Sequence, residues 1–221
     1  DDDVALTAGR SLAVSDAEEP GPQPRSARRS RSRVAAGPVV ALASLDGLAE
    51  LDRGTRVAIR GVVTAPPGTI GQQVFYIADD ENGVQVFVGK RRIPSLVAGD
   101  EVAVTGELRE VGGELRVGIA QASDVRVLRH GRPPEPRVVR AREASASAVG
   151  GLVVVEGEVV EVRGRSVAID DGSEEIRVAL PARAPDAAEA VREGDTIRVV
   201  GILSRTSKGP RLLVRSASDV A

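Results

Sequence analysis

The sequence has 221 residues and is 42% hydrophobic, which is enough for one large domain or two ordinary domains with buried cores. Its 30 basic and 32 acidic side chains give a net charge of -2, so binding to nucleic acid or to an anionic membrane must be local. The lack of Cys excludes disulfides, thiolate metal sites and cysteine nucleophiles, and the single His excludes most imidazole chemistry. Because Val is abundant and aromatic residues are few, the composition favours strands.

Residues 1–36 predict a disordered linker, because this Pro-, Ser- and Arg-rich stretch buries too little surface to offset the entropy of ordering. Within it, residues 25–33 contain five arginines, which either contact phosphate or, as is usual for charge runs, are simply solvated. The chain begins with Asp1 rather than Met, so we expect a fragment of a larger protein or a processed product. No apolar stretch approaches the roughly 18 to 20 residues that cross a bilayer, so we expect no membrane insertion of this part.

One pattern recurs after about 95 residues. Residues 97–108 match residues 192–203, and residues 57–63 match residues 153–159. Both copies then reach the tripeptide Ser-Asp-Val after the same interval. Several matched segments in one order predict an internal repeat.

Each repeat is predicted to form five strands separated by turn residues. The expected strands are residues 55–64, 73–78, 83–88, 100–107 and 114–119, and then residues 152–162, 165–170, 174–180, 195–202 and 210–215. An insertion in the second repeat, residues 182–193, has the Ala-rich composition of a short helix. Three prolines in residues 132–137 predict a joint, so the repeats are expected to occupy residues 37–131 and 138–221.

A long first strand interrupted by Gly, a hairpin whose second strand ends in Asp-Asp and a fourth strand that starts with Gly-Asp resemble the OB-fold. Residues 155–162, 167–172 and 176–180 resemble the anticodon-binding-like branch of this superfamily. The first repeat is similar to OB modules beside nuclease or lamin-tail domains in bacterial surface and secreted proteins. The resemblance implies an all-β chain of two consecutive five-stranded OB-type barrels, and it slightly favours an extracellular or cell-envelope location over the cytoplasm.

The OB-fold binds ligands on the outer face of its second and third strands. Side-chain alternation predicts that Phe75 and Ile77 point into the first barrel, whereas Tyr76 and Phe87 point out and form a base-stacking platform. Basic residues follow at the strand end to meet phosphates, namely Lys90, Arg91 and Arg92. Alternatively, the two rings pack against the other barrel or the long first loop.

The second repeat lacks these rings and carries positive charge instead. Its candidate binding residues lie in the loops and on the third strand, and they are Arg163, Arg165, Arg177, Arg205, Lys208 and Arg211. We expect them to contact the backbone of the same nucleic-acid strand that stacks on the first repeat. The alternative is that they belong to ordinary solvated hairpin tips.

Acidic residues follow the second strand of each repeat, in residues 79–81 and 170–171. Consecutive acids at a hairpin end are common turn chemistry, since Asp side chains bond their own backbone, so we predict no metal site and no cofactor. His130 has no partner acid or second ligand in the sequence pattern, and no serine lies beside a base. The sequence therefore predicts no catalytic residues and no enzyme activity.

The leading prediction is a non-catalytic accessory module of a larger bacterial protein that binds nucleic acid and prefers single strands. Its expected partners are single-stranded DNA or RNA and other domains of the parent protein. The alternative is a structural module, or a protein- or glycan-interaction module, of a secreted or cell-envelope protein. Exposure of Tyr76 and Phe87 side by side would favour the first reading, and burial of the rings would favour the second.

Overall fold

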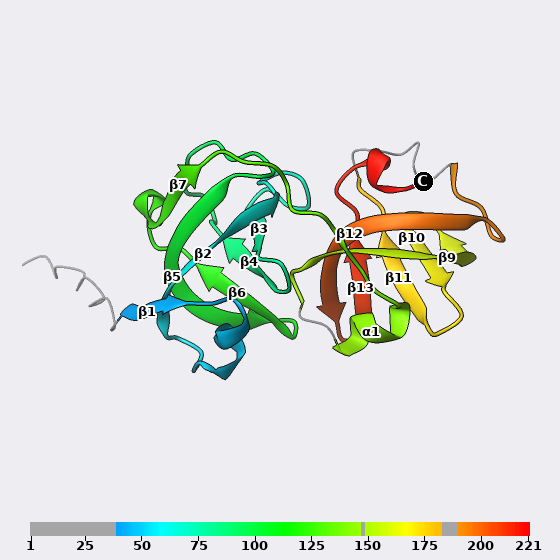
Figure 1. Ribbon diagram of the computed structural model, residues 1–221, viewed down its shortest axis with the longest axis horizontal. Coiled ribbons are helices and arrows are strands. Elements are labelled where there is room, and N and C mark those ends of the chain that lie inside the picture. The colour runs from blue at the N-terminus through cyan, green and yellow to red at the C-terminus, as the bar shows by residue number, and fades with distance from the viewer. Residues whose placement is uncertain (1–38, 147–148, 183–189) are drawn as a thin grey trace, which may run out of the picture. The chain divides into compact units, whose positions relative to one another are not determined.

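The computed structural model describes residues 39–146, 149–182 and 190–221. By its internal contacts the chain divides into residues 1–35 and one compact unit, residues 36–221, which contains both repeats. The described strands form two closed five-stranded barrels, so the predicted all-β class and tandem OB-type architecture are confirmed (Figure 1). The predicted disorder of residues 1–36 and most of the predicted helix at residues 182–193 lie outside the described residues. No helix in the described ranges is long and apolar enough to cross a membrane.

The first barrel has the strand order β2-β3-β4-β6-β5 and is closed by pairing of β5 with β2. Neighbouring strands are antiparallel except β4 and β6, which are parallel. The strands are β2 (Arg56–Ala65), β3 (Val74–Ala78), β4 (Gly83–Phe87), β5 (Glu101–Val111) and β6 (Glu114–Gly118).

The second barrel repeats this plan as β10-β11-β13-β12-β9, closed by pairing of β9 with β10. Its strands are β9 (Leu152–Arg163), β10 (Ser166–Asp170), β11 (Glu175–Ala179), β12 (Thr196–Thr206) and β13 (Gly209–Leu213). All ten predicted strands are present, but β5 and β12 end later than residues 107 and 202, where the prediction ended them. Each continues because a two-residue turn lets its ladder with the next strand run on.

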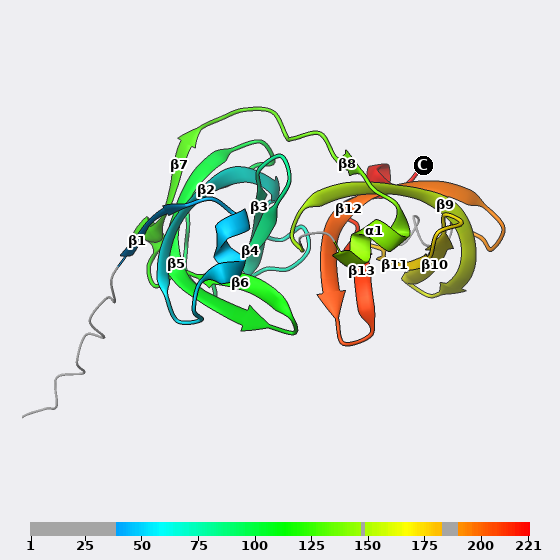
Figure 2. The same cartoon turned by 60° about the horizontal axis from the view of Figure 1, so that its bottom comes forward.

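Several elements were not predicted from the sequence. Strand β1 (Val39–Ala43) pairs in parallel with β2, and β8 (Arg137–Val138) does the same with β9, while β7 (Val125–Arg129) covers an edge of β5. Helix α1 (Ala141–Ala146) lies next to β11 and β13 and buries alanines in the core of the second barrel (Figure 2). The 3-10 helix η1 (Asp46–Glu50) follows β1 as α1 follows β8, so the internal repeat extends further upstream than the sequence indicated.

The matched Ser-Asp-Val segments also have the same structure. They lie in the 3-10 helices η2 (Ala122–Asp124) and η3 (Ala217–Asp219). In each, the Asp carboxylate accepts a hydrogen bond from the backbone N–H three residues earlier, 2.9 Å from Gln121 and 3.3 Å from Ser216. This agreement confirms the repeat in local structure as well as in sequence.

Each barrel has its own apolar core, built by strand alternation. Phe75 and Ile77 point into the first barrel with the alternate residues of β4, as predicted, and the second barrel is filled largely by Val, Ile and Leu. Glycine in each long first strand allows the next strand to cross closely. A β-carbon on Gly157 would lie 2.6 Å from the carbonyl oxygen of Asp170, a distance that no side chain tolerates.

A third apolar cluster joins the two barrels within the compact unit. It contains Tyr76 of β3 together with outward-facing residues of the second barrel, which are Leu152, Val154, Val200, Ile202 and Leu213. Beside this cluster the backbones meet so closely that a β-carbon on Gly83 would lie 2.1 Å from the carbonyl oxygen of Gly150. Arg215 adds a hydrogen bond of 3.0 Å from its Nη1 to the carbonyl oxygen of Thr64. Apolar packing and backbone contact therefore couple the barrels.

Candidate nucleic-acid interface

The structure corrects the predicted stacking platform. Tyr76 does point out of the first barrel, but it is only 2% exposed because the second barrel covers it. Its hydroxyl accepts a hydrogen bond of 2.5 Å from Nε2 of Gln85, and burial raises the pKa of Tyr76 to about 12. Side-chain alternation correctly predicted that Tyr76 points out of the first barrel, but it could not predict that the second barrel covers this side of β3. Tyr76 is therefore an interface residue and not an exposed ring.

Phe87 is the second ring of the predicted platform, and it is half-buried. The guanidinium carbon of Arg116 on β6 lies 5.2 Å from the centre of its ring, within the range of a cation–π contact. Phe87 lies on the same face as Tyr76, diagonally across the strand pair, because Tyr76 is opposite Gln85. Since Tyr76 is buried, the two rings are not exposed side by side, and the prediction of a shared platform is wrong.

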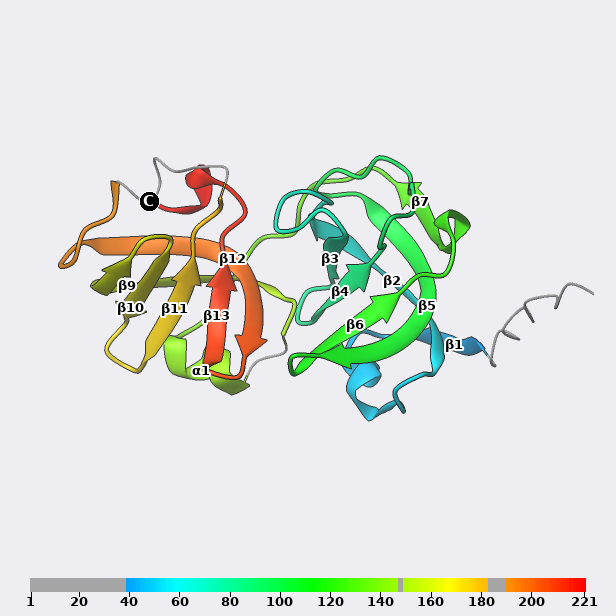
Figure 3. The ribbon, with the colours of Figure 1, turned by 180° about the vertical axis from the view of Figure 1, so that it is seen from behind.

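The corresponding face of the second barrel is basic. Arg177 on β11 is directly opposite Arg211 on β13, and Arg211 is in turn opposite Ser204 on β12. Residues opposite each other on adjacent strands share one face, so the two arginines stand side by side on the outer surface. Figure 3 shows these strands next to one another.

These arginines line a surface hollow of about 440 Å³. Lys208, in the turn between β12 and β13, stands at the same hollow, and the small Ala179 leaves room where the first repeat has Phe87. Hydroxyl groups complete the lining, and the residues that line this hollow include no carboxylate. The hollow thus combines a small apolar floor with a positively charged rim.

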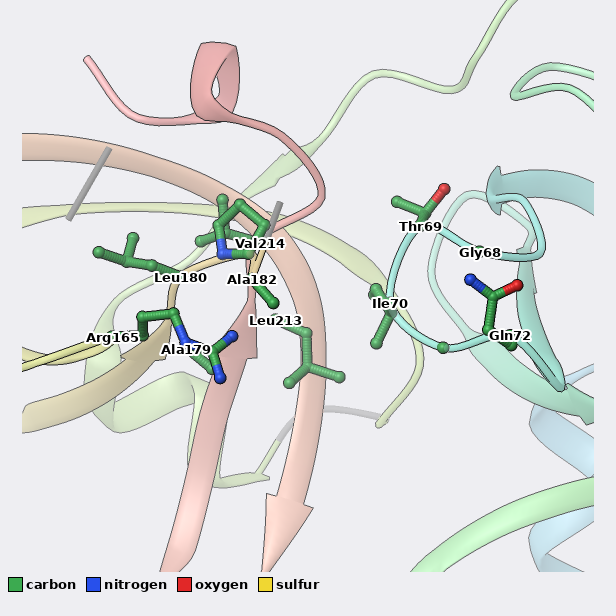
Figure 4. Close-up of a pocket in the computed structure, with 12 residues that line it drawn as sticks. Gly68, Thr69, Ile70, Gln72, Arg165, Ala179, Leu180, Ala182, Leu213 and Val214 are labelled. Atoms are coloured by element: carbon green, nitrogen blue, oxygen red, sulfur yellow. The ribbon is translucent and has the colours of Figure 1, made fainter. Parts of the chain in front are cut away.

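A second, larger groove of about 780 Å³ lies where the two barrels meet. Arg211 lines it as well as the hollow, so the two lie next to each other. Arg116 enters it from the first barrel, and Arg205 from the second. A third cavity, of about 310 Å³, is bounded on one side by the loop with Ile70 and on the other by Arg165 (Figure 4).

Glu114 is the acidic residue among those that line these three cavities. Its Oε1 accepts a hydrogen bond of 2.5 Å from the Ser204 hydroxyl and another from the backbone N–H of Arg205. The Ser204 oxygen also accepts a hydrogen bond of 3.2 Å from Nε of Arg211. Glu114 therefore joins the barrels and helps to orient Arg211, while most of the ionised side chains around the cavities are positive.

Four other predicted residues lie apart from these cavities. Arg91 donates to the carbonyl oxygen of Ala120 at 2.7 Å, so backbone carbonyls occupy its guanidinium. Arg163 forms an ion pair of 2.6 Å with Glu161 at the end of β9. Lys90 and Arg92 are exposed and line none of the described cavities. The structure thus brings together Arg177, Arg205, Lys208 and Arg211, with Arg165 in the adjoining cavity.

Sequence reasoning missed Arg116. A signal was available, because Arg116 is followed after the repeat interval by Arg211, and both stand on the fifth strand of their barrel. The search of the first repeat concentrated on its aromatic residues and did not carry the basic position back from the second. Ser204 was missed for another reason, since its role depends on Glu114 of the other barrel.

The acidic hairpin ends behave as the predicted turns. Asp79 Oδ1 accepts hydrogen bonds from the backbone N–H groups of Glu81 and Asn82, at 3.0 and 2.7 Å. Asp170 accepts one of 2.7 Å from the N–H of Gly172. No group of His and acidic side chains within the described ranges is arranged to hold a metal ion.

Residues 153–220 match the family model of the tRNA anti-codon type, described as an OB-fold nucleic acid binding domain. This match confirms the resemblance that the second repeat showed. No curated protein matches the chain.

Similar solved structures include the tetrameric p202 HIN2 (15% identity, 74% of this chain, 91% of that chain, TM-score 0.37). A murine DNA binding protein bound with ds DNA is also similar (15% identity, 71% and 92%, TM-score 0.37). A third is the hypothetical protein ygiW from E. coli (15% identity, 40% and 91%, TM-score 0.33).

Proposed function

We propose that this chain is a non-catalytic accessory module of a larger bacterial protein that binds single-stranded nucleic acid on the outer face of its second barrel. The observation that carries the proposal is the pair of adjacent arginines, Arg177 and Arg211, on the face of β10, β11 and β13, in a hollow lined by no carboxylate. The match of residues 153–220 to a nucleic acid binding domain family supports nucleic-acid binding by the second barrel.

The chemistry of the hollow suits an unpaired strand. Guanidinium groups bind phosphate through paired hydrogen bonds, and their planar faces also stack on bases. The Arg177 side chain is exposed, and the small Ala179 leaves an apolar floor for a base beside it. A base in a duplex is stacked and paired, so it reaches such a floor only from a single strand.

Binding of labelled oligonucleotides at several salt concentrations tests this function. The full chain is expected to bind single-stranded DNA or RNA more tightly than duplex DNA at low salt, with affinity falling as salt rises. The double variant Arg177→Met with Lys208→Met removes two cations of the hollow. Its salt dependence should be weaker by about 1.4 in the slope of log K against log salt, because each lost phosphate contact on a single strand removes about 0.7.

Arg198→Met is a matched control, since Arg198 is exposed on β12 of the same barrel and lines none of the described cavities. It should leave the slope unchanged. Lack of binding by the wild-type chain at low salt would refute the proposed function. Equal or tighter binding of the duplex would refute the preference for single strands.

A second candidate is an interaction module, and the burial of Tyr76 favours it. The tyrosine on the ligand face of the first barrel serves contact between protein surfaces, so that barrel is already used for docking. A structural or protein- or glycan-interaction module would keep this packing and show no affinity for nucleic acid. The same titration separates the two candidates, because the interaction module predicts no salt-dependent binding for any oligonucleotide.

A further inference from the structure

Arg116, which lines the groove between the barrels, has a partly buried guanidinium. It is half-buried, and its Nε is buried without any hydrogen-bond partner among the residues that the structure describes. Its guanidinium is held over the Phe87 ring, which fixes its position. Buried polar groups are normally hydrogen-bonded, so the guanidinium of Arg116 keeps hydrogen-bonding capacity that the described residues do not use.

A second guanidinium lines the same groove from the other barrel. Arg211 occupies the position in its repeat that Arg116 occupies in the first, and both line the groove of about 780 Å³. Arg211 is held by the Ser204 oxygen at 3.2 Å. Both guanidinium groups are thus positioned by the protein, one by a ring and one by a hydroxyl.

The charge of this groove is unbalanced. Besides Arg116 and Arg211, it is lined by Arg205 and by one carboxylate, Glu114. That carboxylate already accepts two hydrogen bonds through its Oε1, from the Ser204 hydroxyl and a backbone N–H. Glu114, Arg116 and Arg211 line this groove together with Tyr76. Arg116 and Arg211, both only partly exposed, outnumber the one carboxylate that lines the groove, and this excess of positive charge favours a further anion there.

We propose that Arg116 and Arg211 together bind one backbone phosphate of the nucleic acid in the groove between the barrels. This inference rests on the proposed function, because the strand on the outer face of the second barrel supplies the phosphate. Arg211, Thr206 and Ser207 line both the hollow and the groove, so a strand can pass from one to the other without leaving the surface. Both barrels then form one binding site.

The test measures the affinity of the full chain for a labelled single-stranded oligonucleotide as a function of salt. Arg116→Met should lower the affinity about tenfold at low salt, as expected for a lost charge-assisted hydrogen bond. It should also make the slope of log K against log salt less negative by about 0.7. Arg116→Lys keeps the charge, so its slope should remain that of the wild type.

Arg126→Met is the control, because Arg126 is exposed on β7 of the same barrel and lines none of the described cavities. If Arg177→Met weakens binding while Arg116→Met behaves as this control, the two-arginine site is wrong and the proposed function stands. If the wild-type chain binds no oligonucleotide, both fail. Thermal unfolding in the presence of inorganic phosphate tells whether the site binds the phosphate of a nucleic acid or free phosphate. Stabilisation by inorganic phosphate that Arg116→Met abolishes, without oligonucleotide binding, would assign the site to free phosphate and overturn the proposal.

Discussion

Tyr76 is expected to stabilise the contact between the barrels, and its removal tests that role. The ring is 2% exposed and belongs to the apolar cluster that joins the two barrels. Truncation of a buried aromatic residue to Ala usually costs about 3 to 5 kcal/mol. We expect Tyr76→Ala to lose about 3 kcal/mol of unfolding free energy, the lower end of this range, because the ring packs at an interface and not in a closed core.

Tyr76→Phe separates the hydroxyl from the ring. This variant keeps the packing but leaves Nε2 of Gln85 without its acceptor, 2.5 Å away in the wild type, so a loss of about 1 to 2 kcal/mol is expected. Denaturant unfolding measures both variants against Val97→Ala, a control at a side chain that is 58% exposed. A loss below about 0.5 kcal/mol for Tyr76→Ala, as at an ordinary surface site, would refute the buried interface.

The same residue offers a spectroscopic test, because it is the one Tyr of a chain that has no Trp. Burial raises the pKa of Tyr76 to about 12, so its absorbance should change near pH 12 and not near 10. Between these values the folded chain keeps a proton that the unfolded chain releases. Stability should therefore fall as pH rises through this window, and Tyr76→Phe should lack the effect. Titration near pH 10 in the folded protein would contradict the burial.

Three further predictions concern contacts within and between the barrels. Gly83→Val should destabilise the chain by more than about 2 kcal/mol in thermal unfolding, because a β-carbon there would lie 2.1 Å from the Gly150 carbonyl oxygen. Unchanged stability would contradict the close contact between the backbones at Gly83 and Gly150. Glu114→Ala should cost about 1 to 3 kcal/mol, since the buried Ser204 hydroxyl loses its acceptor, and unchanged stability would contradict the contact. A hydrogen bond from the backbone N–H of Val97, and then one with Nδ1 of His130, hold the pKa of the Asp100 carboxyl below its usual range. The stability that ionised Asp100 contributes is therefore present above about pH 4 and is lost as pH falls through the pKa of the folded protein. The stability difference between the wild type and Asp100→Asn should therefore shrink in acid, and a difference that grows there would refute the sign.

Local sequence patterns predicted most of the fold and part of the candidate nucleic-acid interface. Alternation and turn residues located ten strands, since each strand shows its period and its Gly or Asp boundary in the sequence itself. The same alternation put Arg177 on the outer face of the second barrel, and the repeat interval pairs Arg116 with Arg211. Strand β8 was missed because it has only two residues and gains its hydrogen bonds from the long strand beside it. Strand β1 is a short apolar run without alternation, and its pairing with β2 is decided by the tertiary structure.

Tertiary structure decided whether the outer face of each barrel is buried or exposed. Tyr76 and Ala168 occupy corresponding outward positions, and nothing in their own strands says which will meet another barrel. Packing of the second barrel against the first removes the tyrosine from solvent and leaves the arginine face uncovered. The period of two along a strand determines the side on which a residue stands, whereas burial of that side depends on surfaces far away in the chain, which meet only after both barrels have closed.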